Sequence, residues 1–262
     1  MIGTQDENIA YWDSRASVHR DMSTATFPDT YLREREINYI CGYIGRFTPA
    51  SVLDIGCGNG YGTFRYAVRF PNVTFRGEDL STGMIGFALE SLGRLNDPPD
   101  NVSFGVGDVT NLSNADSSYD LICTSRVLIN LGAAERQIVA LREIQRVLKP
   151  GGVYVMLESF SQSYAKLNAL RMEFGLAPLV PHEMNLYMDE DQVQEWCSDS
   201  FTIEEVNPFS STYYIGSRIA YPLILGPEGK PDHEHPVNRL FAQLDSIGDC
   251  GRERILLLRK KR

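Results

Sequence analysis

The sequence predicts an α/β protein with a doubly wound, mostly parallel sheet of seven strands and helices on both faces. The first observation behind this prediction is that short apolar segments alternate with amphipathic helical segments through the first two-thirds of the chain. Such alternation is typical of parallel strands joined by crossover helices. The second is the strong helix expected at residues 133–149, where Leu141, Ile144 and Val147 share one apolar face. The Pro-Gly-Gly at 150–152 should end that helix.

The elements of this core are expected in a regular order. Strands are predicted at residues 51–56, 72–80, 101–109, 119–125 and 153–159. Helices are predicted between them at residues 63–70, 81–95 and 133–149. Ligands on open parallel sheets bind outside the carboxyl ends of the strands. The side chains that follow each strand are therefore the candidates for a binding site.

The last third of the chain has a different pattern. Residues 160–199 are irregular and rich in Met, Pro, Tyr and Asn, so no regular element is expected there. Further on, the sequence predicts strands at 201–209 and 254–260 and a short helix at 237–247. The two strands bring the sheet to seven, and the rest should form a cap or insert over the edge of the sheet.

Composition narrows the classes of function. The 262 residues carry a net charge of −9, which makes nucleic acid and anionic membranes poor partners. The five cysteines are widely spaced and form no CxxC pair, which argues against a disulfide framework and against a zinc site, so no metal is expected. The first 15 residues contain no apolar signal core, and no apolar run approaches the ~18 residues that cross a bilayer. We therefore expect a cytoplasmic protein without membrane insertion.

A glycine-rich turn follows the first predicted strand, in the segment SVLDIGCGNGYG at residues 51–62. A phosphate-binding loop of the GxxxxGK[ST] type is excluded, because no lysine follows the glycines. A dinucleotide turn, GxGxx followed by Gly or Ala, fails as well, since its third position is Tyr61 or Thr63. The carboxylate of Asp54 would repel a pyrophosphate and attract a cation. The turn therefore favours a nucleoside ligand that is cationic.

With these residues, segment 51–158 resembles the Rossmann-like class I methyltransferases that use S-adenosylmethionine (SAM). VLDIGCGNG matches the first motif of that family, hh-D-h-G-x-G-x-G, and RVLKPGG at 146–152 matches a later one. The resemblance implies that the glycine turn passes under the methionine part of SAM and that the motif acid helps to hold its amino group. These roles fall on Asp54, Gly56, Gly58 and Gly60.

The resemblance also assigns the rest of the SAM site. Asp79, 19 residues after Gly60, corresponds to the family's ribose-binding acid, with Leu80 beside it, and the register favours Asp79 over Glu78. Other positions are expected near the adenine or the methionine part. They are Met84, Asp108, Val109, Ser125 and Arg126, and Tyr11 in a helix that covers the ligand. The implied division is a helical cover at 1–45, a SAM-binding core at 46–160 and a substrate cap with the final strands at 161–262.

The acceptor of the methyl group is less well defined. A hydroxyl acceptor needs a base, and Glu158 at the end of the fifth strand is the candidate. Tyr, Asn and Arg side chains suit a polar or anionic small molecule, and the expected contacts are Arg171, Asn185, Tyr187, Tyr213 and Arg218. We expect a small-molecule methyltransferase with a sugar hydroxyl as its acceptor. N-methylation of an amine or amino sugar, and a SAM-binding sensor or assembly protein without turnover, remain as alternatives.

Overall fold

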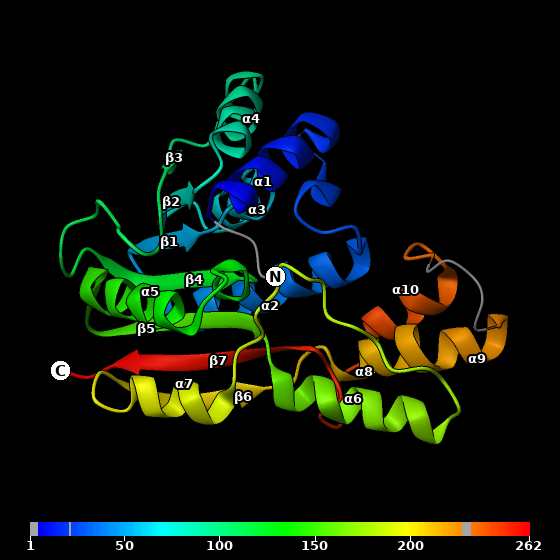
Figure 1. Cartoon of the computed structure of the whole chain (residues 1–262). Helices are drawn as coiled ribbons and strands as arrows, with labels where there is room; N and C mark the ends of the chain where they lie inside the picture. The colour runs from blue at the N-terminus through cyan, green and yellow to red at the C-terminus, as the bar shows by residue number, and fades with distance from the viewer. Residues whose placement is uncertain (1–4, 21, 227–231) are drawn as a thin grey trace.

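A computed structural model of the chain describes residues 5–20, 22–226 and 232–262. A seven-stranded sheet forms its centre, in the order β3-β2-β1-β4-β5-β7-β6 (Figure 1). The strands are β1 (Ser51–Ile55), β2 (Thr74–Asp79), β3 (Val102–Val106), β4 (Tyr119–Ser125), β5 (Leu148–Ser159), β6 (Phe201–Asn207) and β7 (Glu253–Lys260). Strands β1 to β5 are parallel, whereas β7 is antiparallel to both β5 and β6. The predicted fold class is confirmed.

Helices cover both faces of the sheet. The longer ones are α1 (Gln5–His19), α2 (Thr30–Phe47), α3 (Tyr61–Arg69), α4 (Thr82–Gly93), α5 (Ala134–Val147), α6 (Ser161–Glu173), α7 (Glu190–Cys197) and α10 (Pro236–Gln243). The shorter ones are the 3₁₀ turns η1 (Ser23–Ala25) and η2 (Leu128–Asn130), and α8 (Ser211–Ile215), the π-helical η3 (Gly216–Ala220) and α9 (Tyr221–Leu225). Residues 1–4, part of the expected helical cover, lie outside the described residues.

The core has two layers, as strand alternation requires. Val52 of β1 and Val155 of β5 face α2 and α3, where they pack with Ile44 and Tyr66. The intervening Leu53, together with Tyr154 and Met156 of β5, faces α5 and α7 and packs with Ile144 and Val193. Each central strand is thus apolar on both sides, which is why the predicted strand segments are nearly continuous apolar runs.

Two predicted irregular segments are helical in the structure. Residues 160–199 contain α6 and α7, and the mixed segment before residue 226 forms α8, η3 and α9. Helix α6 buries only a narrow face, with Tyr164 and Leu167 three residues apart. Such a narrow stripe produces little periodicity, so the sequence pattern did not show it. The expected helix at 237–247 is confirmed as α10, although it ends at Gln243.

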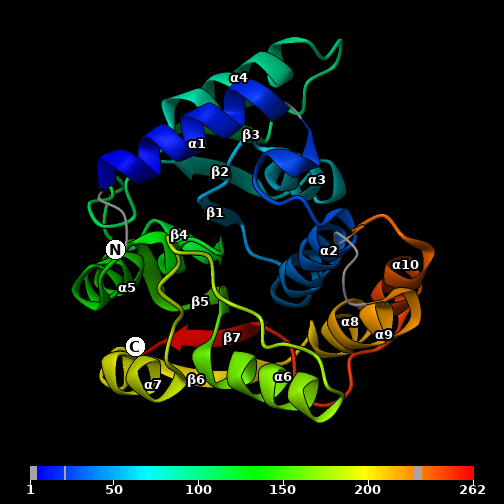
Figure 2. The same ribbon diagram turned by 45° about the vertical axis from the view of Figure 1, so that its right-hand side comes forward.

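The helices outside the sheet form two groups. Helix α1 lies alongside α4 in both views, over the edge of the sheet where the parallel strands end (Figures 1 and 2). Helices α8, α9 and α10 gather at the opposite side, next to α2 (Figure 2). Among the described residues, no helix is both long enough and apolar enough to span a membrane.

Candidate active site

A cavity of about 360 Å³ lies at the carboxyl edge of the parallel strands, beneath α1. Its walls come from the turns after β1, β2, β3 and β4, from the segment before β7, and from the loop between α6 and α7. Eleven predicted site residues line it. These are Tyr11, Gly56, Gly58, Asp79, Leu80, Met84, Asp108, Val109, Ser125, Arg126 and Asn185.

The glycine turn after β1 is shaped by both backbone conformation and crowding. Gly56 and Gly58 have φ values of 69° and 59°, in the left-handed region that favours glycine. A Cβ on Gly56 would lie 2.2 Å from Cγ2 of Val127, and one on Gly58 would lie 2.3 Å from Cγ2 of Thr26. Any side chain at either position would therefore collide with a neighbouring cavity wall.

Asp79 connects the glycine turn to the cavity. Its Oδ2 accepts a hydrogen bond from the backbone N–H of Gly58 (2.8 Å), and its Oδ1 accepts one from Ser81 N–H (2.9 Å). Burial raises the pKa of this carboxyl to about 6, against the opposing effect of the two backbone donors. Each oxygen retains a lone pair, so the carboxylate can accept two more hydrogen bonds from a ligand.

Asp108 lies at the far end of the cavity, after β3. Its Oδ1 accepts from the N–H (2.8 Å) and the hydroxyl (2.7 Å) of Thr110. Its Oδ2 accepts from Nε2 of Gln5 on α1 (2.8 Å), and Oε1 of Gln5 in turn accepts from Nη1 of Arg136 (2.9 Å). This acid therefore joins the covering helix to the floor of the cavity.

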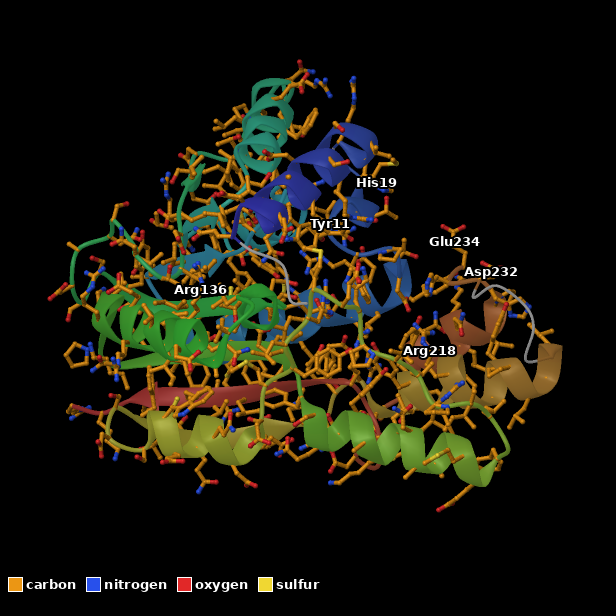
Figure 3. The ribbon with its side chains drawn as sticks, viewed as in Figure 1. Tyr11, His19, Arg136, Arg218, Asp232 and Glu234 are labelled. Carbon is orange, nitrogen blue, oxygen red and sulfur yellow. The ribbon has the colours of Figure 1, made fainter. Side chains whose placement is uncertain are left out.

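Helix α1 forms the roof. Asp13 accepts hydrogen bonds from the Ser81 hydroxyl and from Gly83 N–H at the start of α4. On the other side, Nδ2 of Asn8 donates to the backbone oxygen of Asn130 (2.7 Å). Tyr11 is labelled near the centre of the molecule in Figure 3, and its ring lies 6.1 Å from that of His182 in the loop between α6 and α7. The roof therefore connects both walls of the cavity.

The wall at the end of β4 and the start of β7 is basic and aromatic. Arg126, which has a φ of 58°, and Arg252 both lie against the ring of Phe27, with Cζ at 4.0 and 5.9 Å from its centroid. Burial, and after it the charge of Arg33, lowers the pKa of Arg126 to about 9. Phe27 and Arg252 are not among the site residues predicted from the sequence. Only the antiparallel direction of β7 brings the start of that strand to this edge, and no local pattern reveals that direction.

Seven other predicted site residues do not line the cavity: Asp54, Gly60, Glu158, Arg171, Tyr187, Tyr213 and Arg218. Asp54 is buried beneath the glycine turn, where it accepts from the Thr63 hydroxyl (2.5 Å) and from the Cys123 thiol (3.6 Å). Burial raises its pKa. A Cβ on Gly60 would meet the ring of Phe104 at 2.8 Å, so this glycine allows close packing.

Glu158 is fully buried below the turn that follows β4. Its Oε1 accepts from the N–H groups of Val127 (3.0 Å) and Leu128 (3.2 Å) and from the Thr124 hydroxyl (3.0 Å), and its Oε2 accepts from Ile129 N–H (3.4 Å). Burial raises its pKa to about 7. This carboxylate holds the turn in place, and the geometry does not support a role as a base.

Of the residues predicted to contact the acceptor, one lines the cavity and four do not. Asn185 reaches the cavity, whereas Tyr213 and Arg218 bind the buried Asp29, at 2.5 and 3.4 Å. Arg218 is labelled among the C-terminal helices in Figure 3, away from Tyr11. Arg171 donates to the backbone oxygens of Ala177 (2.9 Å) and Arg218. Tyr187 packs edge-on against Tyr164, with ring centroids 5.1 Å apart.

Across the described residues, no three His, Cys, Asp or Glu side chains are arranged to hold a metal ion. The five cysteines are free thiols, four of them buried.

Comparison with known proteins finds a family model that matches part of this chain. Residues 52–152 match the family model described as "Methyltransferase domain". A malonyl-[acyl-carrier protein] O-methyltransferase from Dechloromonas aromatica is 39% identical over 146 residues, which are 55% of this chain and 50% of that protein. Phosphoethanolamine N-methyltransferase 1 from Arabidopsis thaliana is 36% identical over 43% of this chain and 21% of that protein. The chain spans at most half the length of the first curated relatives it matches.

Solved structures share the whole fold. A magnesium protoporphyrin IX methyltransferase from Synechocystis PCC 6803, with bound SAH, superposes with a TM-score of 0.62 at 15% identity over 98% of both chains. A putative methyltransferase in complex with the Haloferax volcanii Trm112 activator gives a TM-score of 0.63 at 17% identity, covering 96% of this chain and 98% of that chain. At these identities the likeness concerns the fold.

Proposed function

We propose that this chain, whose residues 52–152 are a class I SAM-dependent methyltransferase domain, transfers a methyl group from SAM to a small-molecule acceptor. The observation that carries the proposal is Asp79. Its carboxylate lies at the cavity, is held by Gly58 of the glycine turn, and keeps lone pairs free for a ligand. That is the arrangement by which an acid binds both hydroxyls of a ribose.

The other cavity residues fit the remaining parts of SAM. Gly56 and Gly58 allow a methionine moiety to approach the backbone, and Ser125 lines the same cavity. Asp108 is positioned to accept from an adenine amino group, with Val109 as an apolar wall. Bound SAM supplies an activated methyl group on a sulfonium, whose positive charge the nearby carboxylates favour.

The task of the chain's own residues is then orientation and exclusion of water. Tyr11 and Trp12 of α1 close the cavity from above, and Phe27 adds an apolar surface beside the glycine turn. Holding two reactants in line at short distance supplies much of the catalysis of a displacement reaction. A dry, low-dielectric cavity favours a reaction in which charge is lost.

The kind of acceptor is part of the proposal. A sugar hydroxyl, the expectation from sequence, needs a base to remove its proton. Glu158 is buried and already accepts four hydrogen bonds, so His182 at the cavity is the candidate base for such an acceptor. An amine acceptor is the second candidate, supported by the N-methyltransferases among the relatives.

The test measures SAM binding and turnover separately. We expect Asp79→Ala to weaken SAM binding by about 1–3 kcal/mol, the range for hydrogen bonds lost from a charged group. Calorimetry with SAM measures this change, and Asp97→Ala, an exposed acid, is the matched control. Formation of S-adenosylhomocysteine with an acceptor extract then separates an enzyme from a SAM-binding sensor. Unchanged affinity in Asp79→Ala, or heat with NADH and none with SAM, would refute the assignment.

A further inference from the structure

The strand order distributes charge along the cavity. Going across the sheet, Asp108 follows β3 and Asp79 follows β2, so the first half of the cavity carries two acids, with Arg136 of α5 held near Asp108 through Gln5. Arg126 follows β4 and Arg252 precedes β7, so the second half is basic. The acidic half matches the cationic donor. Arginines beside a sulfonium are favoured where anions lie near them, and beyond the methionine carboxylate of the donor an anionic acceptor would supply one.

Each of the two arginines forms an ion pair with a buried glutamate. Nη1 of Arg126 pairs with Glu36, and Nε and Nη2 of Arg252 pair with Glu253 at 2.7 and 2.6 Å. The two carboxylates are fully buried and do not line the cavity, whereas Arg126 and Arg252 do. The cavity therefore presents hydrogen-bond donors on this side, and the acids that orient them are out of reach of a ligand.

Each guanidinium keeps donor capacity for a ligand. A guanidinium has five N–H donors, and the bonds to Glu36 and Glu253 use only some of those on Arg126 and Arg252. Their side chains are 9% and 22% exposed, and both residues line the cavity. A planar group with two acceptor oxygens matches such donors, since guanidinium and carboxylate pair through parallel N–H···O bonds.

We infer that the acceptor is a carboxylate, bound by Arg126 and Arg252 over the ring of Phe27 and methylated on its own ionised oxygen. The inference rests on the proposed methyltransferase function. One carboxylate oxygen forms a bond to the methyl carbon, the carbon–sulfur bond breaks, and its electron pair stays on sulfur. The anion and the sulfonium become a neutral ester and a neutral thioether, and no proton moves.

This acceptor accounts for the missing base. A carboxylate is ionised near neutral pH, so it is a nucleophile without proton removal. No proton has to be removed, so neither Glu158, which supports the turn after β4, nor His182 is required as a base. A hydroxyl or an amine would leave the free donors of two partly buried arginines unmatched, which is unfavourable.

The first experiment measures binding rather than turnover. Benzoate, benzamide and phenylphosphonate are titrated by calorimetry into the protein saturated with S-adenosylhomocysteine. We expect benzoate to bind at least about tenfold more tightly than the neutral amide, and more tightly than the phosphonate, which carries more charge than the paired arginines favour. Arg252→Gln should remove the preference for benzoate, and Arg252→Lys should keep part of it.

Controls separate charge recognition from loss of structure. Arg252→Gln leaves Glu253 buried and unpaired, so the double variant Arg252→Gln/Glu253→Gln removes both charges together. It should fold, bind S-adenosylhomocysteine and lack the benzoate preference. Arg142→Gln, at an exposed position on α5, should behave as the parent. Equal binding of benzoate and benzamide, no binding of either at millimolar concentration, or a preference retained in the double variant would overturn the inference.

The second experiment identifies the product. The protein is incubated with methyl-labelled SAM and an extract of small metabolites, and the labelled product is treated with alkali. Release of labelled methanol indicates an ester and supports a carboxylate acceptor. A base-stable labelled product would overturn it while leaving the methyltransferase function intact. Failure of the parent protein to bind SAM would instead refute the proposed function itself.

Discussion

The protonation state of Asp79 depends on its burial and would in turn affect the binding of a cationic ligand. Its pKa in the folded protein is about 6, above the usual value for an aspartate of about 4, mainly because of burial. Between these two values the folded state binds more protons than the unfolded state. The contribution of this group to stability therefore falls as pH rises from about 4 to about 6, and it is constant above.

The same shift predicts a pH dependence for SAM binding. Only the ionised carboxylate accepts hydrogen bonds through both oxygens and attracts a cation. SAM affinity should therefore fall as pH drops below about 6. Calorimetry at a series of pH values measures the effect, and the same series on Asp79→Asn should be flatter and weaker throughout. An identical pH profile in the variant would show that another group is responsible.

Glu158 gives a second prediction at this scale. The amide in Glu158→Gln would direct an NH₂ group toward backbone donors that now face a carboxylate. We expect the free energy of unfolding to fall by about 1–3 kcal/mol and SAM affinity to fall with it, because Val127 and Ile129 of the supported turn line the cavity. Thermal denaturation and calorimetry measure both. A slow enzyme with unchanged stability and affinity would restore Glu158 as the base.

These residues also show what sequence can and cannot predict. The resemblance to SAM-dependent methyltransferases singled out Asp79 and Asp108, and both line the cavity at the carboxyl edge of the parallel strands, where ligands bind on such sheets. Asp54 and Glu158 also stand near strand ends, but their side chains point into the protein. The choice of face depends on which turns pack below them. Tertiary contacts decide the direction of each side chain, and the spacing of residues in the sequence does not reveal it.

At the level of elements, α1 forms the roof of the cavity. It is attached to the start of α4 through Asp13, which accepts from Gly83 N–H at 3.0 Å. Removing that carboxylate in Asp13→Ala should loosen the roof and weaken SAM binding by about 1 kcal/mol, mainly through faster dissociation. Stopped-flow release of SAM measures the rate. Ser14→Ala, an exposed position on the same helix, is the control. Unchanged dissociation would mean that α1 does not close the site.

The elements were predicted unevenly. All seven strands and the helices that cross between β1 and β5 were expected near their observed positions, because their apolar patterns are long and regular. Helices α6 and α8 were missed. Their buried faces are short, and they are held by contacts with other elements, such as Arg171 donating to the backbone at Arg218. Periodicity within one segment cannot report such contacts.

For the whole molecule, Asp29 connects the start of α2 to the C-terminal helices. It is fully buried and lies within 3.4 Å of Tyr213, Arg218 and His233. Burial raises its pKa, but hydrogen bonding with His233, the charge of Arg218 and the Tyr213 hydroxyl together bring it below the usual value. Its stabilising contribution is therefore present at neutral pH and is lost as pH falls through this lowered pKa.

A substitution at Asp29 should weaken the whole structure. Asp29→Asn leaves a partly buried guanidinium without its anion, and we expect the free energy of unfolding to fall by about 3 kcal/mol. Urea denaturation measures the change, with Asp245→Asn, at an exposed position, as the control. The difference between Asp29→Asn and the parent should shrink in acid. A stability equal to that of the control would show that the C-terminal helices are held elsewhere.

The position of β7 between β5 and β6 affects the order in which the strands can pair during synthesis. Strand β6 pairs with the rest of the sheet only through β7, which is synthesised after it. On the ribosome, β1 to β5 and their helices can assemble first, and with them the acidic half of the cavity. Strand β6 must wait until β7 inserts between it and β5. The nascent chain therefore assembles the side of the cavity that carries Asp79 and Asp108 before Arg252 joins it.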